Sequence, residues 1–261
     1  MLQHLKAVWL FRHFWLSLVK MDLRSRYRRS VLGIGWSVMH PVLMSVVLVV
    51  GFGHVMMANK YLEYGAYLLC GLCVWDFIRG SVVGGCTSLI SNEAYIRQCP
   101  LPYGIYTLRT VLGTGVHFLI TLTVVVVLTA FLTGTANSFL GLRFVLPTLP
   151  FVFLFCWGAA TVMAFITPYF HDMKHLIEVA AQFFFFVTPI MLPFKGLPPW
   201  LQEFEQYNPV HIYLELIRAP LLSGEAPSLA LYGQGITLGV VVAGLGACMI
   251  AWLQKKIIFE L

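Results

Sequence analysis

Four long stretches of this sequence contain no Asp, Glu, Lys or Arg, and they constrain the fold more than any other feature. They are Ser30–Asn59, Thr110–Leu142, Phe144–His171 and Ala226–Gln254. A helix needs about 20 mainly apolar residues to cross the hydrocarbon core of a bilayer, and each stretch is longer than that. Composition agrees, because 59% of the residues are hydrophobic and only 11% are charged. The sequence therefore predicts an all-α integral membrane protein.

Two further stretches complete a prediction of six transmembrane helices. Tyr64–Ser91 is apolar apart from Asp76 and Arg79, and Val179–Phe194 reaches span length when it is extended back over Lys174–Glu178. Three prolines predict kinked or broken ends for the fourth span: Pro147, Pro150 and Pro168. The six spans are expected at about residues 31–56, 64–91, 104–133, 144–170, 175–194 and 229–253, within one transmembrane domain covering residues 30–261.

The basic residues orient these spans. Twelve fall on one side: Lys6, Arg12, Lys20, Arg24, Arg26, Arg28, Arg29, Arg97, Arg109, Lys174, Lys255 and Lys256. Four fall on the other: Lys60, Arg143, Lys195 and Arg218. Basic residues concentrate on the cytoplasmic side of membrane proteins, so both termini are expected in the cytoplasm. The net charge of +6 is read in the same way, and no nucleic-acid partner is expected.

Residues 1–29 predict a cytoplasmic interface helix followed by a basic elbow. Several polar residues recur at helical spacing on one narrow face, and aromatic and aliphatic side chains fill the remaining arc. Such a helix lies in the membrane interface instead of crossing it. The elbow residues expected to contact lipid headgroups are Arg24, Arg26, Arg28 and Arg29, at about 1 kcal/mol for each basic residue near an anionic surface.

Signals of catalysis are missing from the sequence. There is no HExxH, no GxSxG and no Gly-Lys dipeptide for a phosphate-binding loop. Cys70 and Cys73 form a CxxC pair without a second pair or a histidine cluster, so they are expected to pack as small apolar residues. No catalytic residue, metal or cofactor is expected on this chain. If it takes part in active transport, its ATPase is a separate chain.

Asp76 and Arg79 interrupt the second span and have two readings. Three residues apart on a helix, they could form an ion pair that fixes neighbouring helices, or they could provide a polar contact on a transport path. The run Phe183–Phe186 likewise fits either lipid contact or an apolar channel wall, for which only one or two of the four rings could be used.

Two short segments outside the spans are expected to be helical. Ser91 or Asn92 can cap a short cytoplasmic helix, and Pro100 and Pro102 terminate it. This helix fits either a plain connection between two spans or a protruding docking site for a soluble partner. On the other side, apolar residues between Val210 and Leu221 recur at helical spacing. That segment is expected to press on the outer membrane surface or to dip into it.

Together these features resemble the permease subunit of type-2 ABC exporters that move polysaccharides such as O-antigen, teichoic acid and capsule. The motifs that carry the resemblance are RSRYRRSVLGIGWSVMHP, CGLCVWDFI, NEAYIRQCPLP and NPVHIYLELIRAPLLSG. Two positions depart from the pattern expected of that family, Asp76 and His40, and both could bear on the substrate.

The resemblance implies a homodimer that joins two copies of an ATP-binding subunit, which would hold ATP and Mg²⁺. It implies export of a polysaccharide linked to undecaprenyl diphosphate, most readily O-antigen, across the bacterial inner membrane. The same elbow arginines would then meet the lipid diphosphate. The coupling residues that would contact the ATPase are Asn92, Glu93, Tyr95, Ile96, Arg97 and Gln98. The segments 197–204 and 209–222 would form extracytoplasmic gate helices. The candidate channel and gate residues are Trp36, Trp75, Asp76, Arg79, Phe184, Asn208 and Arg218.

Other functions remain open at this stage. A related permease could carry a drug, another lipid, teichoic acid or capsule. A membrane-embedded transferase acting on lipid-linked sugars would need a cluster of Asp, Glu or His at one membrane face, and a secondary transporter would need an internal repeat. The sequence shows neither feature convincingly.

Overall fold

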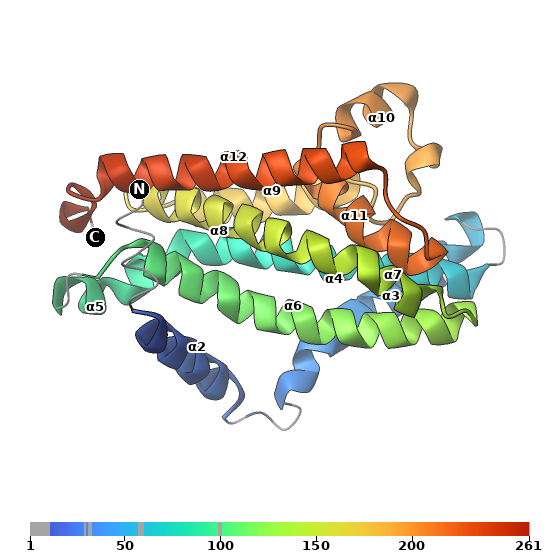
Figure 1. Cartoon of the computed structure of the whole chain (residues 1–261), viewed down its shortest axis with the longest axis horizontal. Helices are drawn as coiled ribbons and strands as arrows, with labels where there is room; N and C mark the ends of the chain where they lie inside the picture. The colour runs from blue at the N-terminus through green and yellow to red at the C-terminus, as the bar shows by residue number, and fades with distance from the viewer. Residues whose placement is uncertain (1–10, 29, 31–32, 57–59, 99–100, 261) are drawn as a thin grey trace.

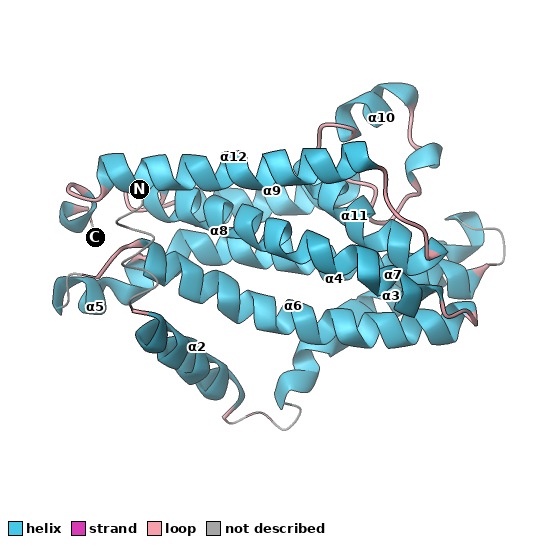
Figure 2. Cartoon of the chain, viewed as in Figure 1, coloured by secondary structure: helices cyan, strands magenta, loops and turns pink. Residues whose placement is uncertain are grey.

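The structure is a computed structural model, and it describes residues 11–28, 30, 33–56, 60–98 and 101–260. The described residues contain helices and connecting loops but no strand (Figure 2). The helices are α2 (Arg12–Tyr27), α3 (Trp36–Met56), α4 (Tyr61–Ser88), α5 (Glu93–Gln98), α6 (Gly104–Thr133), α7 (Asn137–Val145), α8 (Leu149–Ile166), α9 (Met173–Val187), α10 (Pro199–Glu205), α11 (Pro209–Ser223) and α12 (Leu229–Leu253). Short 3-10 turns lie at Gly33–Gly35, Ile90–Asn92, Leu146–Thr148, Phe194–Gly196 and Ile257–Phe259.

Within the described residues, five helical segments are long and apolar enough to cross a membrane: Gly33–His54, Tyr61–Ser88, Gly104–Thr133, Asn137–Ile166 and Leu229–Leu253. The multi-pass membrane architecture predicted from the charge-free stretches is therefore confirmed. The third and sixth predicted spans have the bounds of α6 and α12. The prolines act as expected in the fourth span, since a 3-10 turn at Leu146–Thr148 interrupts it and α8 ends at Ile166, before Pro168.

The predicted fifth span, residues 175–194, is not a full-length helix. The helix α9 has 15 residues, which gives about 22 Å at 1.5 Å per residue against a hydrocarbon core of about 30 Å. It ends where Thr188 takes an extended conformation. The chain then passes through α10 and α11 to reach the far end of the bundle, where α12 begins (Figure 1). The sequence prediction missed this break because it rested on the apolar length of the run, although Pro189 disfavours a helical conformation at Thr188.

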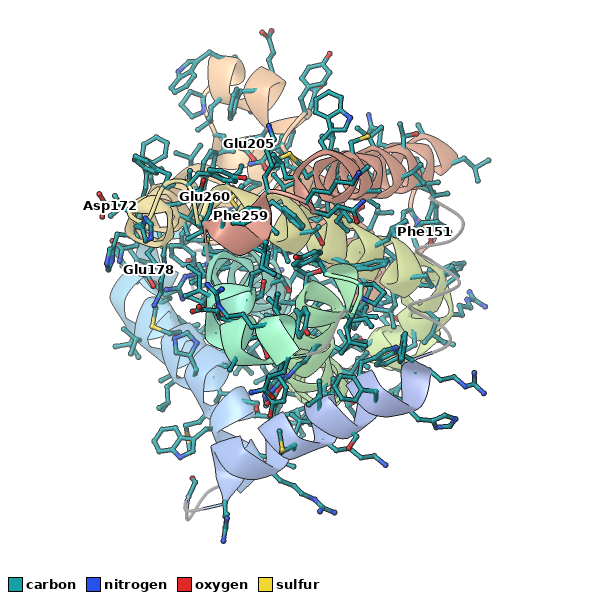
Figure 3. The ribbon with its side chains drawn as sticks, turned by 90° about the vertical axis from the view of Figure 1, so that its left-hand side faces the viewer. Phe151, Asp172, Glu178, Glu205, Phe259 and Glu260 are labelled. Atoms are coloured by element: carbon teal, nitrogen blue, oxygen red, sulfur yellow. The ribbon has the colours of Figure 1, made fainter. Side chains whose placement is uncertain are left out.

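The helix α4 is the centre of the bundle. It packs against α3, α6, α8, α9 and α11, and most of its residues are buried. Close packing requires a glycine at one of these contacts, because a Cβ on Gly85 would lie 2.6 Å from the backbone of Ala160 in α8. Seen along the bundle, α3 and α9 lie on one side of α4, whereas α6, α8 and α12 lie on the other (Figure 3).

Pro41 leaves one backbone carbonyl of α3 in need of a donor. A proline inside a helix removes the N–H that would bind the carbonyl four residues earlier, here that of Ser37. Thr121 of α6 replaces it, since its Oγ1 donates to the Ser37 carbonyl at 3.0 Å. Within a membrane an unsatisfied carbonyl is costly, so this bond explains how the first span tolerates Pro41.

One end of the bundle gathers several segments that are distant in sequence. A buried cluster joins Leu89 and Ile96, near α5, to Tyr106 of α6, Phe165 of α8 and Ile257 beyond α12. The interface helix α2 also contacts α6. The C-terminal segment, α5 and α2 therefore approach the same end, as expected if they share one side of a membrane (Figure 1).

The helix α11 packs against protein along most of its length. Nine of its residues are buried, and it packs against α4, α7 and α12. A Cβ on Gly141 of α7 would overlap the carbonyl of Pro220. The apolar spacing in this segment does mark a helix, but its hydrophobic face contacts protein.

Candidate functional site

Arg109 joins three elements at the end of the bundle that carries α5. It is the one charged residue of α6, and its Nε and Nη2 donate to the two carboxylate oxygens of Asp22 in α2, each at 2.5 Å. Its Nη1 donates to Asn92 Oδ1 at 2.7 Å. The Arg109 side chain is 11% exposed and that of Asp22 is 44% exposed. The interface helix and the turn before α5 are thus held by a single guanidinium group.

The six predicted coupling residues divide into two sets. Asn92 and Ile96 face inward, and the Asn92 amide also donates to the Ser88 carbonyl at 2.7 Å. Tyr95, Arg97 and Gln98 are exposed, and Arg97 donates to Glu93 at 2.7 Å within the helix. Asn92 therefore does not cap α5 as a free surface residue, but anchors it. The surface that remains open to a partner consists of Tyr95, Arg97 and Gln98.

The basic elbow is described only in part. Arg24 and Arg28 are exposed. The Arg26 side chain and all of Arg29 lie outside the described residues. Arg24 lies in the last turns of α2 and Arg28 directly follows that helix, and their exposure fits contact with anionic headgroups, which stays a prediction.

A polar cleft of about 740 Å³ lies between α3, α4 and α6. His40 and Asp76 meet in it, with His40 Nδ1 3.1 Å from Asp76 Oδ2. These are the two residues that depart from the expected family pattern. Among the described residues, Asp76 and Arg79 do not form an ion pair with each other. The interpretation of the two residues as an ion pair within the second span is therefore wrong. Asp76 pairs with α3 instead, and Arg79 is exposed at the cleft.

The remaining polar groups of the cleft come from three elements. Ser37 Oγ lies 2.7 Å from Nδ1 of His117 in α6. Trp36, one of the predicted channel residues, lines the cleft and is 57% exposed. A cleft with an exposed cation, a carboxylate, hydroxyl and imidazole groups and an aromatic face can bind a headgroup or sugar with hydrogen bonds and stacking.

The aromatic residues near α9 occupy different environments. Trp75 is buried in the core, with its ring centroid 5.9 Å from that of Phe185. It is therefore a packing residue in this chain and not an open channel wall. Phe183, Phe184 and Phe186 are exposed at 65%, 41% and 67%, so the apolar face that this chain leaves uncovered on α9 is aromatic.

Asn208 is the junction of the segment predicted to form outer gate helices. Its Oδ1 accepts from the Val210 N–H and caps α11. Its amide donates to Thr188 Oγ1, just after α9, at 2.9 Å and to both carboxylate oxygens of Glu205 in α10. Glu205 is fully buried, and burial raises its pKa although the Asn208 hydrogen bond opposes the shift. Asn208 thus ties three helix ends together.

Arg218 stabilises the break after α9. It is 1% exposed, and it donates to the carbonyls of Pro189 at 2.7 Å and Ile190 at 3.2 Å. Its guanidinium lies 3.8 Å from the ring centroid of Tyr67. These carbonyls belong to non-helical backbone at membrane depth, where each needs a donor. Arg218 was predicted as a channel or gate residue, but in this chain it is buried and binds the backbone carbonyls of the break after α9.

Sequence reasoning missed Asp22, Arg109, Glu205 and Thr188. A signal existed for the first two, because Asp22 is the one acidic residue of the first 29 and Arg109 is the one charge in residues 104–133. Two isolated opposite charges near the same predicted membrane face are candidates for a pair. Glu205 and Thr188 carried no such signal, since their meeting depends on the break after α9.

The profile of the ABC-2 type transporter family matches residues 13–222. Among curated proteins, the chain is 28% identical over 225 residues to the O-antigen export system permease protein RfbA of Klebsiella pneumoniae, covering 84% of this chain and 85% of that protein. It is 25% identical to the protein of the same name from Myxococcus xanthus, covering 76% and 75%. It is 20% identical to the polysialic acid transport protein KpsM of Escherichia coli, covering 78% and 79%.

Proposed function

The chain belongs to the ABC-2 type transporter family, and on that premise we propose that it is the channel-forming subunit of an ATP-driven polysaccharide exporter. The proposed cargo is a polysaccharide linked to undecaprenyl diphosphate, with O-antigen first among the candidates, moved across the bacterial inner membrane. The observation that carries this proposal is similarity over about five-sixths of both chains to a permease named for O-antigen export.

The geometry supports a mechanical role for the cytoplasmic end. In this proposal two ATP-binding subunits, which hold ATP and Mg²⁺, dock against Tyr95, Arg97 and Gln98 of α5 and against α2. Arg109 ties both docking elements to α6, one of the long membrane helices. A movement of the partner would therefore reach a transmembrane helix through hydrogen bonds and without passing through a flexible loop.

The membrane portion supports passage of a polymer between two copies of the chain. A polysaccharide is too long to be enclosed in an ordinary pocket of about 300–1,000 Å³. The apolar faces of α3 and α9 are left open by this chain, with Val50 at 81% and Phe186 at 67% exposed. A homodimer formed on that side would cover them, and the path of α9, α10 and α11 would complete six passages with both termini in the cytoplasm.

A second cargo is supported by one observation, the similarity to a polysialic acid transport protein. Polysialic acid is a capsular polymer, so capsule export is the second candidate. Teichoic acid, a drug or another lipid remain further alternatives without an observation that favours them. A lipid-linked sugar transferase is a further alternative. The part of the chain that the structure describes contains no group of three or more Asp, Glu, His or Cys residues that could hold a metal ion for it.

Deleting the gene and restoring it in the source bacterium tests the function. If the proposal is correct, the deletion removes the polymer from the cell surface and lipid-linked polymer accumulates inside the cell. Restoring the wild-type chain reverses both effects. Loss of the polymer without internal accumulation would indicate a role in synthesis and contradict export, and loss of capsule instead of O-antigen would decide between the two cargoes.

A further inference from the structure

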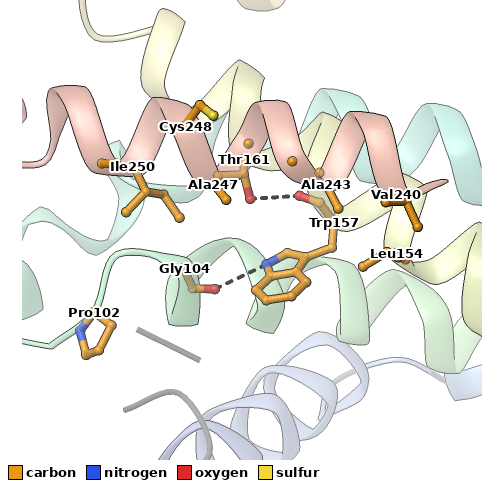
Figure 4. A pocket seen from close by; sticks show the side chains of 14 residues that line it. Pro102, Gly104, Leu154, Trp157, Thr161, Val240, Ala243, Ala247, Cys248 and Ile250 are labelled. Atoms are coloured by element: carbon orange, nitrogen blue, oxygen red, sulfur yellow. Dashed lines mark hydrogen bonds between the residues drawn. The ribbon is translucent and has the colours of Figure 1, made fainter. Parts of the chain in front are cut away.

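An apolar groove of about 400 Å³ lies on the side of the bundle away from α3 and α9, next to the end that carries α5 (Figure 4). Its walls are Pro102, Gly104 at the start of α6, and a row of small residues on α12. Trp157 of α8 forms part of the lining between them. None of the residues that line the groove is assigned above to docking or transport.

The groove offers almost no free hydrogen-bonding groups. Trp157 Nε1 already donates to the Gly104 carbonyl at 3.3 Å and to Thr107 Oγ1 at 3.1 Å. Thr161 Oγ1 donates to the Trp157 carbonyl at 2.7 Å. A sugar or other polar ligand would find no partner here, so the occupant must be hydrocarbon.

The groove lies where the acyl chains of membrane lipids can enter it. The span Leu229–Leu253 is the least buried of the five, with 11% of its apolar window buried, so its open surface faces lipid. A methylene group needs about the same ~30 Å³ as a water molecule in liquid, so the groove holds roughly a dozen methylene groups, close to one acyl chain. A polyprenyl chain several times longer would not be contained in it.

Positive charge lies just beyond the groove. Ala251 is its last lining residue on α12, and Lys255 and Lys256 follow within about one helical turn, both exposed. This is the headgroup level on the same end as α5. The two ammonium groups also outweigh the partial negative charge at the C-terminus of α12, so the site favours an anionic headgroup.

We propose that this groove is a binding site for an anionic phospholipid of the surrounding membrane, with one acyl chain between α6 and α12 and its phosphate at Lys255 and Lys256. The bound lipid would fill the space between these two membrane helices at the end where Arg109 holds α2 and α5. The site requires only that the chain spans the membrane, and it does not depend on the cargo.

Photo-crosslinking of the full chain in lipid nanodiscs tests the site. Phosphatidylglycerol and phosphatidylcholine carrying the same diazirine acyl chain are compared at equal mole fraction, and labelled peptides are mapped by mass spectrometry. We expect stronger labelling of peptides containing Trp157 and Ala247 by phosphatidylglycerol. In the double variant Lys255→Gln/Lys256→Gln this preference should fall by roughly 25-fold, since each basic residue contributes about fivefold near an anionic surface.

Gly244→Leu tests the groove itself. A Cβ on Gly244 meets no atom within 4 Å, so leucine enters the open space and should reduce labelling by both lipids. Gly233→Leu is the matched control, because Gly233 lies on the same helix with equal free space outside the groove. Equal labelling by the two lipids in the wild type, or no effect of Gly244→Leu, would overturn the proposal. Protection of the groove by added polyprenyl diphosphate would assign it to the cargo lipid instead.

Discussion

Nε and Nη2 of Arg109 in α6 donate to the two carboxylate oxygens of Asp22 in α2, each at 2.5 Å, and Nη1 of Arg109 donates to Asn92 Oδ1 at 2.7 Å. A planar guanidinium can make such a fork, whereas an ammonium group cannot. The two segments expected to meet an ATPase are thereby joined to each other and to a transmembrane helix. This makes Arg109 the residue on which coupling should depend most.

Replacing Arg109 with Lys should separate ATP hydrolysis from export. The charge remains but the fork to Asp22 and the bond to Asn92 cannot both form, and loss of one charge-assisted hydrogen bond costs about 1.5–3 kcal/mol. We expect sugar exported per ATP hydrolysed to fall about tenfold or more in vesicles containing the reconstituted transporter. Arg143→Lys is the matched control, because Arg143 is an exposed arginine of α7 outside the proposed docking surface. Equal effects of the two substitutions would refute the special role of Arg109.

Thr121 and Pro41 should be energetically coupled although they lie on different helices. Thr121→Val removes the donor to the Ser37 carbonyl and should lower the free energy of unfolding by about 1 kcal/mol, a typical value between membrane helices. In a Pro41→Ala background the restored N–H satisfies that carbonyl, so Thr121→Val should become nearly neutral. A double-mutant cycle in detergent measures this coupling, and purely additive effects would argue against the replacement bond.

His40 and Asp76 should act on export as one unit. Under the proposed function the polar cleft meets the headgroup or sugars of the cargo, and each residue holds the other at 3.1 Å. We expect His40→Asn and Asp76→Asn each to lower export severalfold, with the double variant no worse than either. Lys60→Gln breaks an exposed ion pair and should leave export unchanged. Additive losses at His40 and Asp76 would mean that they act separately.

His211 should make the protein less stable in acid. It is 8% exposed, stacks on Phe194 with ring centroids 5.0 Å apart, and burial together with the charge of Arg218 lowers its pKa to about 4. The unfolded chain therefore binds this proton more readily, and the free energy of unfolding should decrease as pH falls from about 6.5 towards 4. His211→Phe keeps the stacking and should flatten this slope in unfolding measurements across that range. An unchanged slope would assign the acid sensitivity to other groups.

Apolar length and charge placement were enough to predict most of the membrane helices. The predicted bounds of the third and sixth spans agree with α6 and α12, and Pro147 and Pro168 mark the interruption and end of the fourth span. Pro189 is a local signal for the break at Thr188, but the contact that stabilises the break could not be predicted, because Arg218 supplies the donors from a helix nearly thirty residues later. The same long-range contact explains why α11 lies inside the protein.

The site was predicted less well, because polar pairs within a membrane are chosen by tertiary contact. Asp76 had a partner at helical spacing in Arg79, yet it pairs with His40 on a neighbouring span. Both His40 and Asp76 depart from the pattern expected of the family, but only the packing of α3 on α4 brings them together. Asn92 is a similar case, since its capping role was plausible locally and Arg109 instead uses its side chain.

Transport by purified components tests the central claim most directly. The chain is combined with the ATP-binding protein encoded beside it in proteoliposomes that contain undecaprenyl-diphosphate-linked O-antigen, and the fraction of polymer on the far side of the membrane is measured. The account predicts polymer movement that requires both proteins and hydrolysable ATP, and that is lost, with ATP hydrolysis retained, when Glu93–Gln98 is replaced by a flexible linker. Movement of the polymer by this chain without an ATP-binding partner, or normal export with the linker in place, would contradict it.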